Sequence, residues 1–151
     1  MNAAGTAFEE FQQIATHGAF GWESFTTNGG STTFLAVANR DDDSSQNLNS
    51  IIYRMNAAGT AFEEFQQIAT QGAQSWESFT TNGGTTTFLA VANRYDGSSY
   101  NTNSVVYRMN AAGTAFEEFQ QITTHGASDW ESFTTNCGST TFLAVANYND
   151  G

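Results

Sequence analysis

A repeat with a period of 54 residues constrains the fold of this 151-residue chain more than any other feature. The phrase MNAAGTAFEEFQQI begins at Met1, Met55 and Met109. The first two copies are identical at 44 of 54 positions, and the third copy, 43 residues long, differs from the first at seven. Near-identical sequences fold into near-identical units, so we expect one domain over 1–151, built from repeats 1–54, 55–108 and 109–151.

Each copy predicts four strands. TTFLAVANR, residues 32–40 of the first copy, is apolar on both sides of its alternation, which is typical of a strand buried on both faces. NSIIYRMN (49–56), AFEEFQQIAT (7–16) and WESFTTN (22–28) predict the other three, with turns rich in Gly, Asn, Asp and Ser between them. AFEEFQQIAT has a helical alternative, which its flanking Gly and Thr residues and the lack of a cap disfavour.

Four short antiparallel strands in a unit of this length predict an all-β fold made of propeller blades, about three per chain. We expect the FLAVAN strand of each blade to line the central axis and the WESFTTN strand to form the outer edge. A monomeric β-trefoil, which also has three repeats of four strands, is the alternative.

The strand order at the two ends of the chain predicts assembly. The chain starts with the AFEEFQQIAT and WESFTTN strands and ends with a FLAVAN strand, so the two ends together supply one blade without its NSIIYRMN strand. Three blades are too few for a ring, because propellers have about four to eight. We therefore expect a ring closed between chains, as a homodimer of six blades or another closed homo-oligomer.

Charge and composition exclude several classes of partner. Four arginines and fifteen carboxylates give a net charge of −11, which repels nucleic acid and anionic membranes and favours solubility. No apolar stretch approaches the roughly 18 residues of a membrane span, so membrane insertion is not expected. The single cysteine, Cys137, allows no intrachain disulfide, and we expect a free thiol.

No residue pattern predicts an enzyme or a cofactor. His17 and His125 occupy equivalent positions, but the second copy has Gln71 there, which a catalytic or metal-binding role would not tolerate. DDDSS at 41–45 has enough oxygen atoms for Ca²⁺, yet the other copies lack this run, so a solvated turn is favoured over a calcium loop. A cation near Asn39, Asn93 and Asn147, which end the FLAVAN strands, is an equally weak candidate.

Several motifs resemble the epilepsy-associated repeat, also called EAR or EPTP, across essentially the whole chain. Those that carry the resemblance are Phe88–Asn93, Val106–Arg108, Phe119–Ile122, and Gly126–Ala127 with Asp129–Glu131. The resemblance implies a seven-bladed propeller, an extracellular location and a role in protein binding. This chain departs from the family in having fewer than three repeats and in their near-identity.

Two functions compete on the sequence alone. Near-identical units favour a multivalent, lectin-like protein that binds cell-surface glycans through repeated weak sites, whereas the family resemblance favours a protein–protein interaction propeller. A symmetric structural protein without a ligand is a third possibility. The candidate ligand-binding residues are Trp22, Trp76, Trp130, Asp42, Asp96, Asp150, His17 and His125. For the indoles, filling the gap between neighbouring blades is the favoured role over stacking on a sugar.

The differences between the copies fall mainly at 17, 20, 21 and 41–48 and their equivalents. These positions lie in two turns that an antiparallel blade places at the same end. We therefore expect one varied face and one uniform face.

Overall fold

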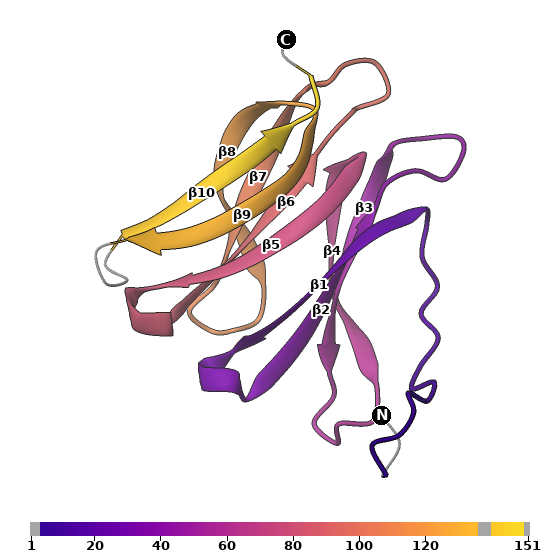
Figure 1. Cartoon of the computed structure of the whole chain (residues 1–151), viewed down its shortest axis with the longest axis vertical. Helices are drawn as coiled ribbons and strands as arrows, with labels where there is room; N and C mark the ends of the chain where they lie inside the picture. Colours follow the sequence, from indigo (N-terminus) through magenta and orange to yellow (C-terminus); the bar gives the residue numbers. More distant parts are fainter. Residues whose placement is uncertain (1–3, 136–139, 150–151) are drawn as a thin grey trace.

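The computed structural model describes residues 4–135 and 140–149, and they form three antiparallel sheets (Figure 1). Each sheet is a meander of strands that are consecutive in sequence. The first sheet consists of β1 (Ala19–Thr27), β2 (Thr32–Asn39), β3 (Asn47–Met55) and β4 (Phe62–Gln71). The second consists of β5 (Ala73–Thr81), β6 (Thr86–Asn93), β7 (Asn101–Met109) and β8 (Phe116–His125). The third consists of β9 (Ala127–Thr135) and β10 (Thr140–Asn147).

The predicted all-β fold and its four-stranded antiparallel blades are confirmed. Short 3₁₀ turns, η1 (Asn28–Gly30) and η2 (Asn82–Gly84), join β1 to β2 and β5 to β6. The register is the same in both complete sheets, with Trp22 opposite Val37 in the first and Trp76 opposite Val91 in the second. The chain forms separate stacked sheets, which excludes the trefoil, and the described residues do not close into a ring.

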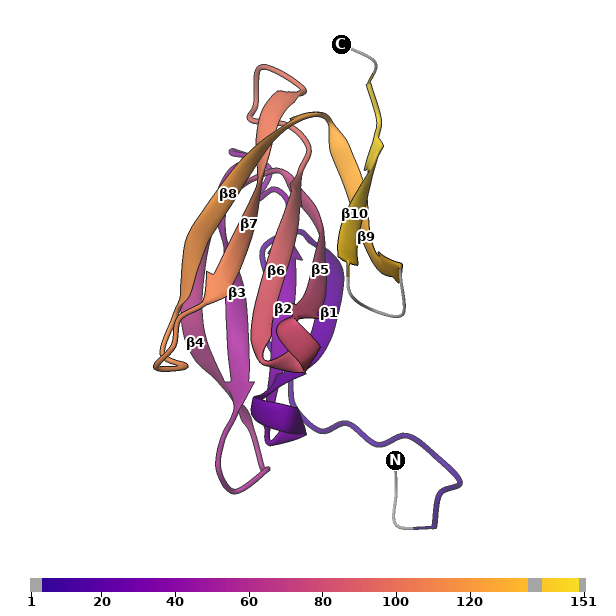
Figure 2. The same ribbon diagram turned by 90° about the vertical axis from the view of Figure 1, so that its left-hand side faces the viewer.

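The prediction of which strand lies nearest the axis is wrong. Successive sheets meet along their first strands, β1, β5 and β9, while β4 and β8 lie at the opposite edges of their sheets (Figures 1 and 2). The WESFTTN strand therefore occupies the place predicted for FLAVAN. FLAVAN is apolar on both sides because, as β6 of the middle sheet, it has a neighbouring sheet on each face. A strand that lined a central axis would show the same apolar pattern.

One sequence, TTFLAVAN, shows what creates the core. As β6 it lies between two sheets and is almost entirely buried, whereas as β10 it has a neighbour on one side and is largely exposed. Its equivalent phenylalanines face the sheet that follows: Phe34 packs 6.2 Å from Phe116 of the second sheet and is 1% exposed, and Phe88 is 8% exposed. Phe142, which has no following sheet among the described residues, is 45% exposed. Burial therefore comes from stacking one sheet on the next, as in repeat proteins whose units contact only their neighbours.

The segment 7–16 was predicted to be a strand, and in the structure it is not one. The same motif does form β4 and β8, where it pairs with β3 and β7, whereas no described strand pairs with 7–16. The segment still packs on the first sheet. Gln12 donates to the carbonyl oxygen of Phe62 at 3.0 Å and accepts from its N–H at 2.8 Å. Gln66 of β4 binds Phe116 of the second sheet in the same way, at 2.9 and 2.8 Å.

Gly72 makes the tight link from β4 of one sheet to β5 of the next. Its φ is +55°, a conformation that L side chains rarely adopt. A Cβ there would lie 2.6 Å from the carbonyl oxygen of Tyr95. Gly18, with φ +52°, approaches the carbonyl oxygen of Asp41 in the equivalent place. Glycine is therefore required where each new sheet begins.

We expect Gly72→Ala to lower the free energy of unfolding more than Gly59→Ala does. Alanine at either positive φ costs about 1–2 kcal/mol. At Gly59, where φ is +69°, a Cβ would meet no described atom within 4 Å, whereas at Gly72 overpacking adds about 1–3 kcal/mol. Urea denaturation of the two variants measures the difference, and equal losses would contradict this role for Gly72.

Candidate interaction surface

The connections 40–46 and 94–100 lie at one end of the molecule, together with the links between sheets; we call this end the loop face (upper part of Figure 1). Hydrogen bonds join the two kinds of connection: the N–H of Gly72 donates to the carbonyl of Gln46 at 2.6 Å, and that of Gly126 to the carbonyl of Tyr100 at 2.7 Å. The predicted pairing of these turns is therefore confirmed. Among the positions at which the copies differ, 20, 21, 41, 43 and 46 lie at this end.

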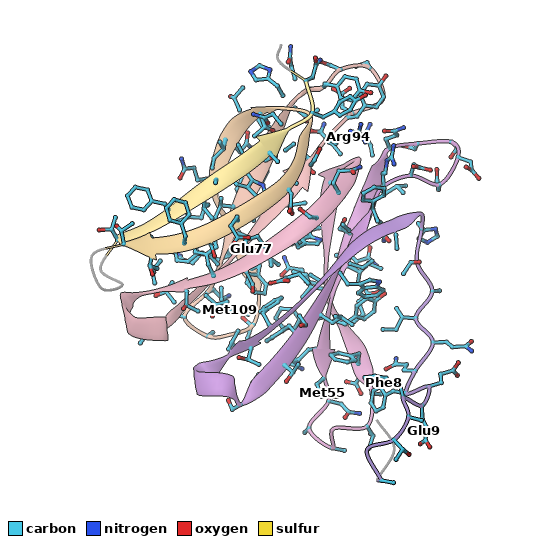
Figure 3. The ribbon with its side chains drawn as sticks, viewed as in Figure 1. Phe8, Glu9, Met55, Glu77, Arg94 and Met109 are labelled. Carbon is cyan, nitrogen blue, oxygen red and sulfur yellow. The ribbon has the colours of Figure 1, made fainter. Side chains whose placement is uncertain are left out.

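An arginine surrounded by tyrosines is the most distinctive feature of the loop face. We call Arg94, which is labelled in Figure 3, and Tyr95, Tyr100 and Tyr148 the Arg94 cluster. The guanidinium carbon of Arg94 lies 4.1 Å from the ring centroid of Tyr148 and 5.9 Å from that of Tyr100. The Tyr95 and Tyr100 rings are 4.7 Å apart between centroids. Such cation–π contacts hold the guanidinium in place while leaving its hydrogen-bond donors available.

The cluster borders a hollow of about 180 Å³ on which two of the four arginines of the chain converge. Arg40 lies 3.6 Å from the carboxylate of Asp41. The Nε of Arg94 is buried and has no hydrogen-bond partner among the described residues. A buried donor without a partner is uncommon in folded proteins. The guanidinium also places a positive charge on an otherwise acidic chain, which attracts anionic groups to this part of the surface.

The predicted indole sites are not a common surface. Trp76 and Trp130 are each 4% exposed, and their Nε1 atoms donate to backbone carbonyls of the preceding sheet, at 3.0 Å to Val37 and 3.1 Å to Val91. The gap-filling role between blades is therefore confirmed for these two residues. Trp22, on the first sheet, is 45% exposed. Two of the three indoles thus have no face available for stacking on a sugar.

The carboxylates of Asp42 and Asp96 stabilise their own loops. Asp42 accepts hydrogen bonds from the N–H groups of Ser44 and Ser45 at 3.1 and 2.8 Å and from the Ser44 hydroxyl at 2.7 Å. Asp96 makes the same contacts with Ser98 and Ser99 at 2.7–2.8 Å. These hydrogen bonds, from the serine side chain first and then from the backbone, lower the pKa of both carboxyls below 3.8.

The two histidines are not brought together. His17 precedes the first sheet and its N–H donates to Asn39 Oδ1 at 3.2 Å, while His125 ends β8 with its Nδ1 2.7 Å from Asn101 Oδ1. Asp150 and Cys137 lie outside the described residues. The histidines therefore form no shared site with each other.

Two of the asparagines that end the FLAVAN strands use their side-chain amides for hydrogen bonds to the backbone. Asn39 Nδ2 donates to the carbonyl of Asn49 at 2.9 Å, and Asn93 Nδ2 to that of Asn103 at the same distance. Within 4–135 and 140–149, no group of three or more His, Cys, Asp or Glu side chains is placed to hold a metal ion. No helix in this part of the chain is long and apolar enough to cross a membrane.

Sequence reasoning missed the Arg94 cluster, because its residues come from connections far apart in the chain. A usable signal was present. Tyr95 and Tyr100 replace Asp41 and Gln46 of the first copy, and Tyr148 replaces Arg40. These tyrosines occur at positions where otherwise matching copies differ. Such a pattern indicates a surface that is not simply repeated from copy to copy.

Comparisons with known proteins all identify the same kind of repeat in this chain. The family model for the EPTP domain matches residues 7–56, 61–110 and 115–151. Two relatives, the Thrombospondin-type laminin G domain and EAR repeat-containing proteins of Homo sapiens and Mus musculus, are each 44% identical over 144 residues. The match covers 95% of this chain and 21% of each relative, so the chain spans about one fifth of their length.

The loop carboxylates give a pH prediction. Because the pKa of Asp96 is depressed in the folded chain, its contribution to stability is present above the unfolded value and is lost as pH falls through the folded value. We expect the amides of Ser98 and Ser99 to lose protection from hydrogen exchange below pH 3.8, and Asp96→Asn to abolish this pH dependence. A carboxyl titration midpoint at or above 3.8, measured by NMR, would contradict the assignment.

Proposed function

The chain belongs to the EPTP-domain family of epilepsy-associated repeats, and we propose that it is a protein-binding module made of propeller blades. The observation that carries the proposal is the Arg94 cluster on the loop face. Arginine and tyrosine are enriched where proteins bind one another, because they combine a large apolar area with strong hydrogen-bond donors. The proposed role is binding alone, with no reaction catalysed.

The charges of the chain restrict the kind of partner that it can bind. A chain with a net charge of −11 attracts a basic surface and repels an acidic one at long range. At the Arg94 cluster the local requirement is reversed, because the free donors of a guanidinium fit a carboxylate. The partner is therefore a protein with a mainly basic surface that places one Asp, Glu or terminal carboxylate against Arg94.

The proposed location is extracellular. The two relatives are named for a thrombospondin-type laminin G domain alongside EAR repeats, a combination that suggests secreted proteins. Glycan binding is not proposed, because it depended on exposed indoles and Trp76 and Trp130 are buried between sheets.

Screening the chain against an array of purified extracellular protein domains, with a glycan array in parallel, tests the proposal. We expect protein ligands whose affinity falls at least about tenfold in Arg94→Ala, a loss of about 1.4 kcal/mol. The matched control, Ala58→Gln on the exposed β3–β4 turn at the opposite end, should bind like the unmodified chain. Binding to glycans only, or protein binding that Arg94→Ala leaves unchanged, would overturn the proposal.

A further inference from the structure

The two junctions between sheets use the same set of contacts. At the first, Trp76 Nε1 donates to the carbonyl of Val37, and Glu23 accepts from Ser78 through its N–H at 3.2 Å and its hydroxyl at 2.6 Å. At the second, Trp130 donates to Val91, and Glu77, which points from β5 toward β9 in Figure 3, accepts from the Ser132 N–H at 2.9 Å. Each sheet thus offers a carboxylate and a carbonyl, and the next sheet supplies an indole and a serine.

An aromatic cluster completes the first junction. Phe116 of the second sheet is 2% exposed, because three rings of the first sheet surround it. Its ring centroid lies 5.8 Å from Phe25, 6.2 Å from Phe34 and 6.4 Å from Phe65, each in an edge-to-face arrangement. The junction therefore combines directional hydrogen bonds with a compact group of four phenylalanines.

The first sheet displays one half of this junction on its free side. Trp22 and Ser24 are the equivalents of Trp76 and Ser78, and Trp22 is 45% exposed. Phe62, the equivalent of Phe116, is contacted by one ring only among the described residues: Phe11 of the N-terminal segment, 6.5 Å away and edge to face. Phe11 is the equivalent of Phe65, so one of the three surrounding rings is already in place.

The third sheet displays the other half. Phe133 and Phe142, the equivalents of Phe25 and Phe34, stack on each other at 5.4 Å and are both exposed. Glu131 and Val145 are the equivalents of Glu23 and Val37. The two rings that Phe62 lacks are therefore the two exposed at the far end of the same chain.

We propose that a second copy of this chain docks head to tail, with its first sheet on the third sheet of the copy before it. Trp22 of one copy then donates to the Val145 carbonyl of the other, and Ser24 donates to Glu131. Phe133 and Phe142 enclose Phe62 beside Phe11. The occupant is a copy of this chain because the two free faces are the two halves of a junction that the chain itself makes twice.

Head-to-tail docking also uses both ends at once. The three described sheets of one copy give six in a pair, within the range in which propellers close. A contact between two different surfaces forms a ring when the rotation closes and a filament when it does not. In this closed homodimer β9 and β10 of one copy and segment 7–16 of the other share a blade, in which the place of the third strand is unfilled.

Two variants, each with one blocked end, test the proposal. Trp22→Ala removes the donor face and Phe142→Asp places a charge on the acceptor face. In 0.15 M salt, which screens the repulsion between two acidic chains, we expect sedimentation at twice the 16.3 kDa chain mass for the unmodified chain. Each variant alone should sediment as a folded monomer. Their mixture should give a weaker dimer held by one intact junction, because the other junction then carries both substitutions.

Ala112→Gln is the matched control, because it changes an exposed side chain on the β7–β8 turn of the second sheet, which belongs to neither free face, and should leave the dimer intact. Circular dichroism of each variant establishes that loss of the dimer is not loss of the fold. The proposal is overturned by a monomeric unmodified chain at all concentrations tested, by open-ended filaments, or by either variant forming a dimer as stable as that of the unmodified chain. The outcome is separate from the array experiment, since binding at the loop face does not require a second copy.

Discussion

The hydrogen bond from an indole N–H to a backbone carbonyl of the preceding sheet is the contact on which the rest of the structure depends. Trp76 and Trp130 each make it, and each ring is buried with it. It sets the distance between neighbouring sheets and aligns β5 and β9 with the sheets before them. A single sheet has no core of its own, so the apolar faces of the FLAVAN strands are buried only where this stacking occurs.

Because stacking requires the same contacts at each junction, the junction residues are constant between the copies while the loop surface varies. The residues at the junctions, Trp, Glu, Ser and the phenylalanines, are the same in all three copies. The loops at one end contribute no residue to these contacts of the indole, glutamate, serine and phenylalanine side chains, and there the copies differ. The Arg94 cluster arises from those differences. A stack of near-identical sheets can therefore present a binding surface that is not repeated.

Much of the fold could be predicted from the sequence, because it depends on local patterns. Alternation and turn residues located the four strands and their antiparallel order. The axial strand was misplaced because FLAVAN, apolar on both sides, fits an axis and a stack equally well. For the site, the structural alternative was right for the indoles of Trp76 and Trp130, and Asp42 and Asp96 proved to be turn residues. The Arg94 cluster was missed because Tyr100 and Tyr148 meet only through the stacking of the second and third sheets.

Hydrogen exchange of the three indole N–H groups, followed by NMR at a concentration at which the chain is monomeric, tests the central claim most directly. The three tryptophans occupy identical sequence contexts in WESFTTN, so stacking is the main difference between them. We expect slow exchange for Trp76 and Trp130, whose N–H groups bind the preceding sheet, and fast exchange for Trp22. Fast exchange at all three, or protection of Trp22 in the monomer equal to that of the other two, would contradict the account.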